Sequence, residues 1–292
     1  MMRWKLGIIG GSGLYDLEQL ERAAWIDVAS PWGRASDSVL VGAMAGTEVA
    51  FLPRHGRGHR LAPYEVNARA NIDVLKRLGC TDIIAVSAVG SLREDLAPGA
   101  FAVARQYIDR TRERPGTFFG DGVVAHVSLA DPVCPRLSRM LIEAGQSISV
   151  PISDRATYVA VEGPQFSTRA ESMLYRQWAA DVIGMTSMPE ARLAREAELP
   201  YANLCMVTDF DCWRSADAQV DVPEVLRIMA ANVAKAKVLI ASLVASLPDE
   251  RTPSSIDTCL DHAIISAPEH WTAPAREKLA AIAGRRLGVE PR

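Results

Sequence analysis

The sequence predicts an α/β domain built in layers around a mostly parallel sheet, and three observations support this prediction. Short apolar runs typical of buried strands alternate with longer segments whose apolar residues recur at helical spacing. The 292 residues are 49% hydrophobic and 23% charged, a composition that supplies a large core. No internal repeat or low-complexity segment interrupts this alternation.

The first third of the chain is predicted to hold four strands and one helix. The strands are short apolar runs bounded by turn residues, at residues 6–10, 39–42, 49–53 and 82–88. Residues 66–78 are predicted to form the helix, because their apolar residues recur at helical spacing and Gly79 follows as a C-cap.

The rest of the main body continues the same alternation. A proline in the first turn marks a helix at residues 135–144. The remaining predicted strands are residues 158–162, 182–185 and 201–208, and the remaining helices are residues 168–178, 190–198 and 223–247.

A polar connector at residues 247–257 separates the main body from the end of the chain. We therefore predict a main domain at residues 1–250 and a C-terminal extension at residues 251–292. The extension contains an amphipathic segment at residues 273–287 and is too short to fold alone. We expect its helix to pack on the body or on a neighbouring subunit.

Composition argues against several classes of protein. With a net charge of -3, the chain has no excess of basic residues that would favour binding to nucleic acid or to an anionic membrane. The five cysteines are widely spaced, which disfavours a zinc site or a disulfide framework and favours reduced thiols in the cytoplasm. We expect no signal peptide, no metal and, because no run of about twenty apolar residues exists, no membrane helix.

Small and polar residues lie at the ends of five predicted strands, where ligands of open α/β sheets collect. They are Ser12, Arg54-His55, Ser87-Ala88, Thr186-Ser187 and the pair Asp209 and Asp211. Arginine suits bidentate contact with phosphate oxygens, and a glycine-rich turn brings backbone N–H groups onto an anion. The turn alone is a weak signal, because Asp16 replaces the third glycine of a dinucleotide fingerprint.

Two carboxyl groups one residue apart end the last predicted strand. Asp209 and Asp211 cannot both be comfortably ionised if water is excluded there. One of them is expected to hold a proton near neutral pH and to donate it to a basic ring nitrogen. The alternative is a solvated acidic loop.

Six stretches together carry a family resemblance: residues 7–14 (GIIGGSGL), 54–56 (RHG), 90–94 (GSLRE), 162–172 (EGPQFSTRAES), 180–186 (ADVIGMT) and 208–213 (TDFDCW). They resemble the trimeric purine nucleoside phosphorylases, and within that family the 5'-methylthioadenosine phosphorylases. The resemblance spans about residues 6–247. It implies a single-domain nucleoside phosphorylase fold, with a central mixed β-sheet flanked by helices.

The resemblance also implies the reaction and the partners. The reaction is reversible phosphorolysis of 5'-methylthioadenosine to adenine and 5-methylthioribose 1-phosphate, in methionine and purine salvage. Inorganic phosphate is a co-substrate, and no cofactor is required. The assembly is a homotrimer or a hexamer made of two trimers.

Site residues carry over from the family by position. Those implied for phosphate are Ser12, Arg54, His55, Ser87, Ala88 and Thr186. Those implied for the nucleoside are Met185 under the ribose, Phe166 near the purine, Asp209 and Asp211 at the base edge, and His126 from a neighbouring subunit. Ser167, Val222 and Val225 are implied in specificity, and Asp209 is the expected general acid. Relatives often have asparagine at the position of Gly184.

Alternatives remain open at this point. The apolar residues Phe166, Met185, Val222 and Val225 could be core residues, and His126 could be a surface histidine. A related phosphorylase acting on methylthioinosine or on 6-oxopurine nucleosides is the nearest rival function. A dinucleotide-dependent oxidoreductase and a non-catalytic nucleoside-binding protein are the others. Two aspartates favour adenine, since carboxylates accept hydrogen bonds from its 6-amino group.

Overall fold

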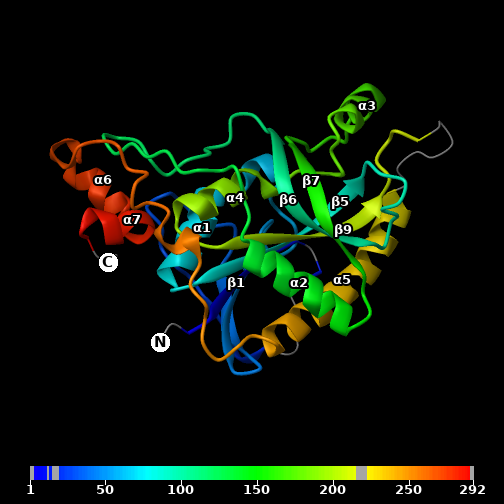
Figure 1. Cartoon of the computed structure of the whole chain (residues 1–292), viewed down its shortest axis with the longest axis horizontal. Helices are drawn as coiled ribbons and strands as arrows, with labels where there is room; N and C mark the ends of the chain where they lie inside the picture. Colours follow the sequence, from blue (N-terminus) through cyan, green and yellow to red (C-terminus); the bar gives the residue numbers. More distant parts are fainter. Residues whose placement is uncertain (1–2, 12, 15–19, 215–221, 290–292) are drawn as a thin grey trace.

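The computed structural model describes residues 3–11, 13–14, 20–214 and 222–289, with the backbone alone at 222. In this part of the chain one mixed sheet forms the centre of the molecule (Figure 1). Its strands are β1 (Lys5–Gly10), β2 (Glu21–Ile26), β3 (Val39–Met44), β4 (Thr47–Pro53), β5 (Asp82–Ser91), β6 (Phe101–Arg110), β7 (Ile152–Val161), β8 (Val182–Gly184) and β9 (Tyr201–Asp209). The mixed sheet confirms the predicted fold class.

The sheet order is β2-β3-β4-β1-β5-β8-β7-β6-β9, and β5 also pairs with β9. Strands β5 to β9 therefore close on themselves, while β1 to β4 extend from one side. The expectation of a mostly parallel sheet is too simple, because β3 runs antiparallel to β4 and β9 runs antiparallel to β6. Around the site the relevant pairs are parallel: β1 with β4, β1 with β5, and β5 with β9.

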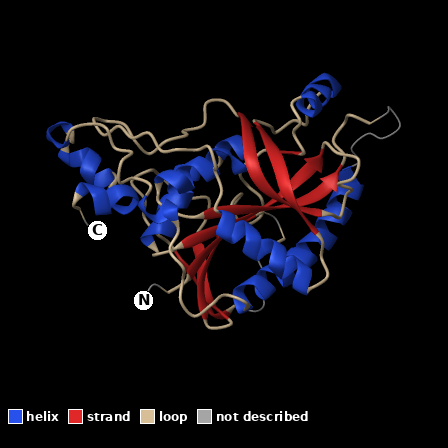
Figure 2. Ribbon diagram, viewed as in Figure 1, coloured by secondary structure: helices blue, strands red, loops and turns tan. Residues whose placement is uncertain are grey.

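Helices cover both faces of the sheet (Figure 2). They are α1 (Ala68–Arg77), α2 (Pro135–Ser147), α3 (Arg169–Gln177), α4 (Ser187–Glu196), α5 (Val222–Ala245), α6 (Ala273–Lys278) and α7 (Ala280–Leu287). One core cluster joins the sheet to α1, α4 and α7, and a second joins it to α2 and α5. Short 3-10 helices lie at Pro63–Glu65, Ser255–Thr258 and Pro268–His270.

The sequence patterns did not predict strands β2 and β6, nor the break in the helix predicted at residues 273–287. Strand β2 has only exposed residues, so it lacks the apolar alternation that marks a strand. Strand β6 is buried at its start and polar toward its end, which hides its length. The predicted helix at residues 273–287 is two helices that meet at Leu279.

The described part of the C-terminal extension packs on the body of the same chain. Helix α7 lies against α1, and Ile264 forms a bridge with Ala125 in the long connection between β6 and α2. Arg251 is buried and forms ion pairs with Asp82 and with Asp257. In Figure 1 this extension lies at the opposite end of the view from α3.

Helix α5 bears on the expectation that the chain has no membrane helix. The helix at residues 223–245 is long and apolar enough to cross a membrane by length and composition alone, and an 18-residue window within it has a mean hydropathy of 1.7. Its inner face nevertheless belongs to the core, where Val233, Leu239 and Leu243 pack beneath the sheet. A core helix passes the same test, so this finding is weak evidence for a membrane span.

The buried ion pair of the extension gives a stability prediction. Arg251→Ala leaves the fully buried Asp82 with less compensation, so we expect the free energy of unfolding to fall by about 3–5 kcal/mol. Arg227→Ala is the control, because its pair with Glu224 is exposed and contributes about 1 kcal/mol at most. Urea denaturation measures both; equal losses would contradict the structural role of Arg251.

Candidate active site

The strand ends of the central sheet enclose one hollow of about 290 Å³. Parallel pairing brings the carboxyl ends of β1, β4, β5 and β9 to the same edge of the sheet, and β8 enters beside them. Of the residues predicted for the site, those that line this hollow are Arg54, His55, Ser87, Ala88, Phe166, Ser167, Met185, Thr186, Asp209, Asp211 and Val225.

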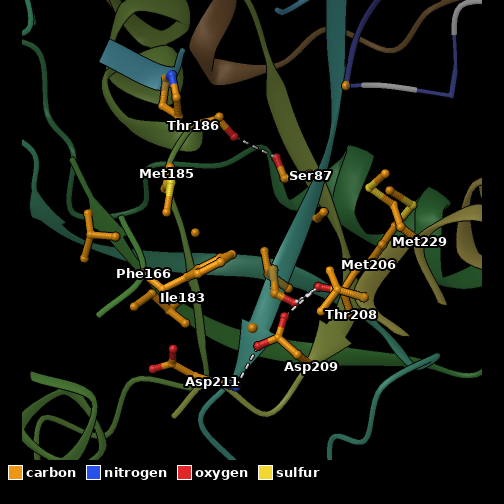
Figure 3. A pocket seen from close by; sticks show the side chains of 18 of the residues that line it. Ser87, Phe166, Ile183, Met185, Thr186, Met206, Thr208, Asp209, Asp211 and Met229 are labelled. Atoms are coloured by element: carbon orange, nitrogen blue, oxygen red, sulfur yellow. Dashed lines mark hydrogen bonds between the residues drawn. The ribbon is translucent and has the colours of Figure 1, made fainter. Parts of the chain in front are cut away.

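One end of the hollow offers hydroxyl groups. Ser87 in β5 and Thr186 after β8 place their side-chain oxygens 3.4 Å apart. Figure 3 shows these two side chains at one end of the hollow, with Asp209 and Asp211 at the other. Two adjacent hydroxyls suit the oxygens of a tetrahedral anion, since each can donate one hydrogen bond.

Arg54 lies at the same end and is 1% exposed. Its Nε and Nη2 atoms bind the two carboxylate oxygens of Glu190 at 2.9 and 3.0 Å. It also donates to the carbonyls of Val86 and Ile9. Four of its five N–H groups are thus used, and one on Nη1 has no partner among the described residues. Burial alone would lower the pKa of Arg54, but Glu190 raises it above its usual value.

His55 follows Arg54 and is also buried. Its Nδ1 atom lies 2.9 Å from the carbonyl oxygen of Leu61, and its ring stacks on that of His59 with centroids 4.3 Å apart. Burial, and after it the charge of Arg54, lowers the pKa of His55 to about 4. The ring is therefore neutral at physiological pH in the empty site.

The middle of the hollow is apolar. Met185 and Phe166 line one side, and Met206 and Met229 the other (Figure 3). The side chain of Phe166 is 57% exposed, so the hollow is open to the surface there. Gly184 also lines the hollow, and a Cβ atom at this position would come 2.0 Å from the hydroxyl of the buried Tyr158.

The far end holds the two acids. Asp209 accepts hydrogen bonds from the hydroxyl of Thr208 at 2.8 Å and from the backbone N–H of Asp211 at 2.7 Å. Asp211 is 5% exposed, and its Oδ2 has no partner among the described residues. Burial raises the pKa of Asp211 and the charge of Asp209 adds to this, whereas the nearby Ser172 lowers it. Asp211 is therefore not part of a solvated acidic loop, whereas Asp209 is partly exposed.

Three predicted residues are not among the described residues that line the hollow. Ser12 and the side chain of Val222 lie outside the described residues. His126 is exposed on the connection between β6 and α2, where its backbone N–H bonds to Ala263. Its contribution to a neighbouring subunit stays a prediction.

The sequence pattern missed residues that the fold brings to the site. Thr208 and His59 line the hollow; Thr208 stands within the motif at residues 208–213, and His59 follows the motif at residues 54–56. Glu190 gave no usable signal, because one acid in a predicted helix usually faces solvent. The described residues contain no group of three or more His, Cys, Asp or Glu that could hold a metal ion.

The fold and the hollow define a class of protein. A hydroxyl-lined end beside Arg54 and a pair of acids lie in one hollow at the carboxyl edge of an α/β sheet, an arrangement that suits an enzyme that cleaves a nucleoside with phosphate. A model described as the phosphorylase superfamily matches residues 5–245. The chain belongs to this superfamily.

Two curated relatives and one solved structure are similar to this chain over nearly its whole length. S-methyl-5'-thioadenosine phosphorylase of Rhodospirillum rubrum is 53% identical, with 97% of each chain covered. That of Cereibacter sphaeroides is 50% identical, covering 98% of this chain and 99% of the relative. A methylthioadenosine phosphorylase crystal structure from an antarctic soil metagenomic library has 46% identity and a TM-score of 0.91, covering 96% of this chain and 99% of that chain. The resemblance seen in the sequence is confirmed.

The contact between Gly184 and Tyr158 gives a prediction. Gly184→Ala forces a methyl group against a buried hydroxyl, so we expect a loss of about 1–3 kcal/mol in the free energy of unfolding. Gly120→Ala is the matched control, because nothing lies within 4 Å of its added Cβ. Thermal unfolding of the two variants measures the difference; equal stabilities would show that Tyr158 moves aside without cost.

Proposed function

We propose that this protein is an S-methyl-5'-thioadenosine phosphorylase whose reaction takes place in the hollow between Ser87 and Asp209. The observation that carries the proposal is that an anion end and an acid end line a single hollow. The S12T mutant of an adenosine/methylthioadenosine phosphorylase from Schistosoma mansoni is solved in complex with methylthioadenosine; it has 38% identity and a TM-score of 0.80, covering 83% of this chain and 91% of that chain. The reaction is reversible phosphorolysis of methylthioadenosine to adenine and 5-methylthioribose 1-phosphate.

Phosphate is held at the anion end in this proposal. The hydroxyls of Ser87 and Thr186 donate to its oxygens, and the remaining Nη1 N–H of Arg54 adds one more donor. Ser12, Ala88 and His55 complete the proposed set. One phosphate oxygen attacks C1' of the ribose as the bond to the purine breaks, through a transition state that resembles an oxocarbenium ion.

The purine departs at the acid end. The broken bond leaves its electron pair on the base, and Asp209 supplies a proton to N7. Thr208 and the N–H of Asp211 hold the Asp209 carboxyl in place. Asp211 offers an acceptor for the 6-amino group of adenine. A 6-oxo group would instead place an acceptor against an acceptor, which disfavours methylthioinosine and inosine.

The rest of the nucleoside lies against the apolar wall. Met185 packs under the ribose and Phe166 lies near the purine. Val225 at the start of α5, together with Val222 and Ser167, tunes specificity, with the two valines near the 5' substituent. An apolar wall of this kind prefers a methylthio group to a hydroxyl.

The proposal includes a homotrimer or a hexamer of two trimers. Large apolar residues that are 40–57% exposed include Phe166, the pair Met173 and Leu174 in α3, and Trp178 at the end of α3. Covering them with a second copy would close the open side of the hollow, and His126 of that copy would reach the 5' pocket. Free cysteines support a cytoplasmic location, and the reaction needs no cofactor besides phosphate.

A product assay tests the activity. The protein should release adenine from methylthioadenosine only when phosphate is present, which chromatography detects directly. Methylthioinosine, inosine and guanosine should react more slowly, by roughly 10⁴ where a buried hydrogen-bonding edge is mismatched. Release at equal rates in the absence of phosphate would contradict phosphorolysis.

Asp209→Asn tests the acid. The amide keeps the shape of the side chain but has no acidic proton, so kcat on methylthioadenosine should fall about 10²–10⁴-fold with folding intact. Asp249→Asn, at an exposed acid on the C-terminal connector, is the control and should retain full kcat. Wild-type kcat in the Asp209 variant would remove Asp209 from the mechanism.

A further inference from the structure

The anion end of the hollow carries no net fixed positive charge. Among the described residues that line the hollow, Arg54 alone has a permanently charged cationic side chain. Its charge is already matched by Glu190, which binds it through both carboxylate oxygens and is itself 1% exposed. A phosphate dianion that enters this end therefore meets a neutral ion pair.

Nearby charges do not change this balance. Arg114, from the connection between β6 and α2, pairs with Glu162 at 2.9 Å and donates to the carbonyl of Met185. His59 stacks on His55. At the far end, Asp209 and Asp211 add negative charge if ionised. A buried dianion without compensation costs several kcal/mol, so the site needs another source of positive charge.

His55 has the geometry to supply it. The carbonyl oxygen of Leu61 can only accept a hydrogen bond, so Nδ1 at 2.9 Å carries a hydrogen. The neutral ring then has its lone pair on Nε2, which has no partner among the described residues. Because His55 lines the hollow beside Arg54, Nε2 is the nitrogen available to an anion bound there.

We propose that His55 takes up one proton on Nε2 when the site binds a phosphate dianion. This rests on the proposed function, and it specifies how the same site balances charge. The proton comes from solvent and forms an N–H bond at Nε2, which donates to an anion oxygen. The Nδ1 hydrogen bond to Leu61 stays in place throughout.

The sign of the pH dependence follows from the two states of His55. In the empty site the pKa of His55 is about 4, below its ordinary value, so the ring is neutral at pH 6.5. A bound dianion raises this pKa. Between the two pKa values, binding takes up about one proton, and the Kd of the anion rises about tenfold for each unit of pH.

Sulfate is the probe that tests this proposal, because it is a tetrahedral dianion that does not itself take up a proton in this pH range. Calorimetric titration of the intact protein with sulfate at pH 6.5, in buffers of different ionisation enthalpy, measures protons taken up per site. We expect about one, with a Kd that rises about tenfold per pH unit. No uptake, or no sulfate binding by a protein that binds phosphate, would overturn the proposal.

Two variants locate the proton. His55→Gln should abolish the proton uptake and the pH dependence, whereas Asp209→Asn should keep both, since it alters only the far end. In histidine-labelled protein, the nuclear magnetic resonance signal that is missing in His55→Gln should shift to the imidazolium position when sulfate is added. Unchanged uptake in His55→Gln, or a neutral His55 signal with sulfate bound, would contradict the assignment.

The calorimetry does not depend on turnover, so the two proposals can fail separately. Phosphate-dependent adenine release without proton uptake on sulfate binding would reject the role of His55 and leave the phosphorylase function intact. Proton-coupled sulfate binding without adenine release would do the reverse.

Discussion

The buried pair of Arg54 and Glu190 is the interaction on which the anion end depends. It joins the end of β4 to α4, and Tyr201 in β9 donates to the same carboxylate at 2.9 Å. Two parallel hydrogen bonds fix the plane of the guanidinium as well as its position. Separating any of these elements would leave a buried charge without its partner, at a cost of about 3–5 kcal/mol. The anion end is therefore held in place by the core of the protein and not by its loops.

The acid end is fixed by the backbone of two strands. Pairing of β5 with β9 shifts register at Gly90, which lies opposite Asp209 while Val89 lies opposite Val207. A Cβ atom at Gly90 would come 2.9 Å from the Asp209 carboxyl. Because glycine has no Cβ atom, that carboxyl can lie against β5. Since β5 also carries Ser87, one strand sets the separation of the anion end from the acid end.

Much of this arrangement could be predicted from the sequence, and the exceptions have physical causes. Strand ends such as Arg54 and Asp209 were recognisable, because a buried apolar run followed by a charged residue marks a place where the sheet meets a ligand. Strand β2 was missed because it buries nothing, and β6 because burial fades along it. Glu190 was missed because its meaning depends on a partner 136 residues away, and no local pattern encodes that contact. The fit of Tyr158 against Gly184 is of the same kind.

A neutral anion end has a consequence for turnover. An uncompensated cation would bind the phosphate group of substrate and that of the sugar phosphate product about equally well. Such uniform binding does not lower the barrier of the chemical step, and it slows product release. With Glu190 matching the charge of Arg54, the remaining contacts are the hydroxyl donors and the proposed Nε2–H of His55, hydrogen bonds whose strength depends on direction. A donor aimed at the attacking oxygen can favour the transition state, whereas a bare charge favours every phosphate species alike. Because of the ion pair, the site binds phosphate through directional hydrogen bonds and not through an uncompensated positive charge on Arg54.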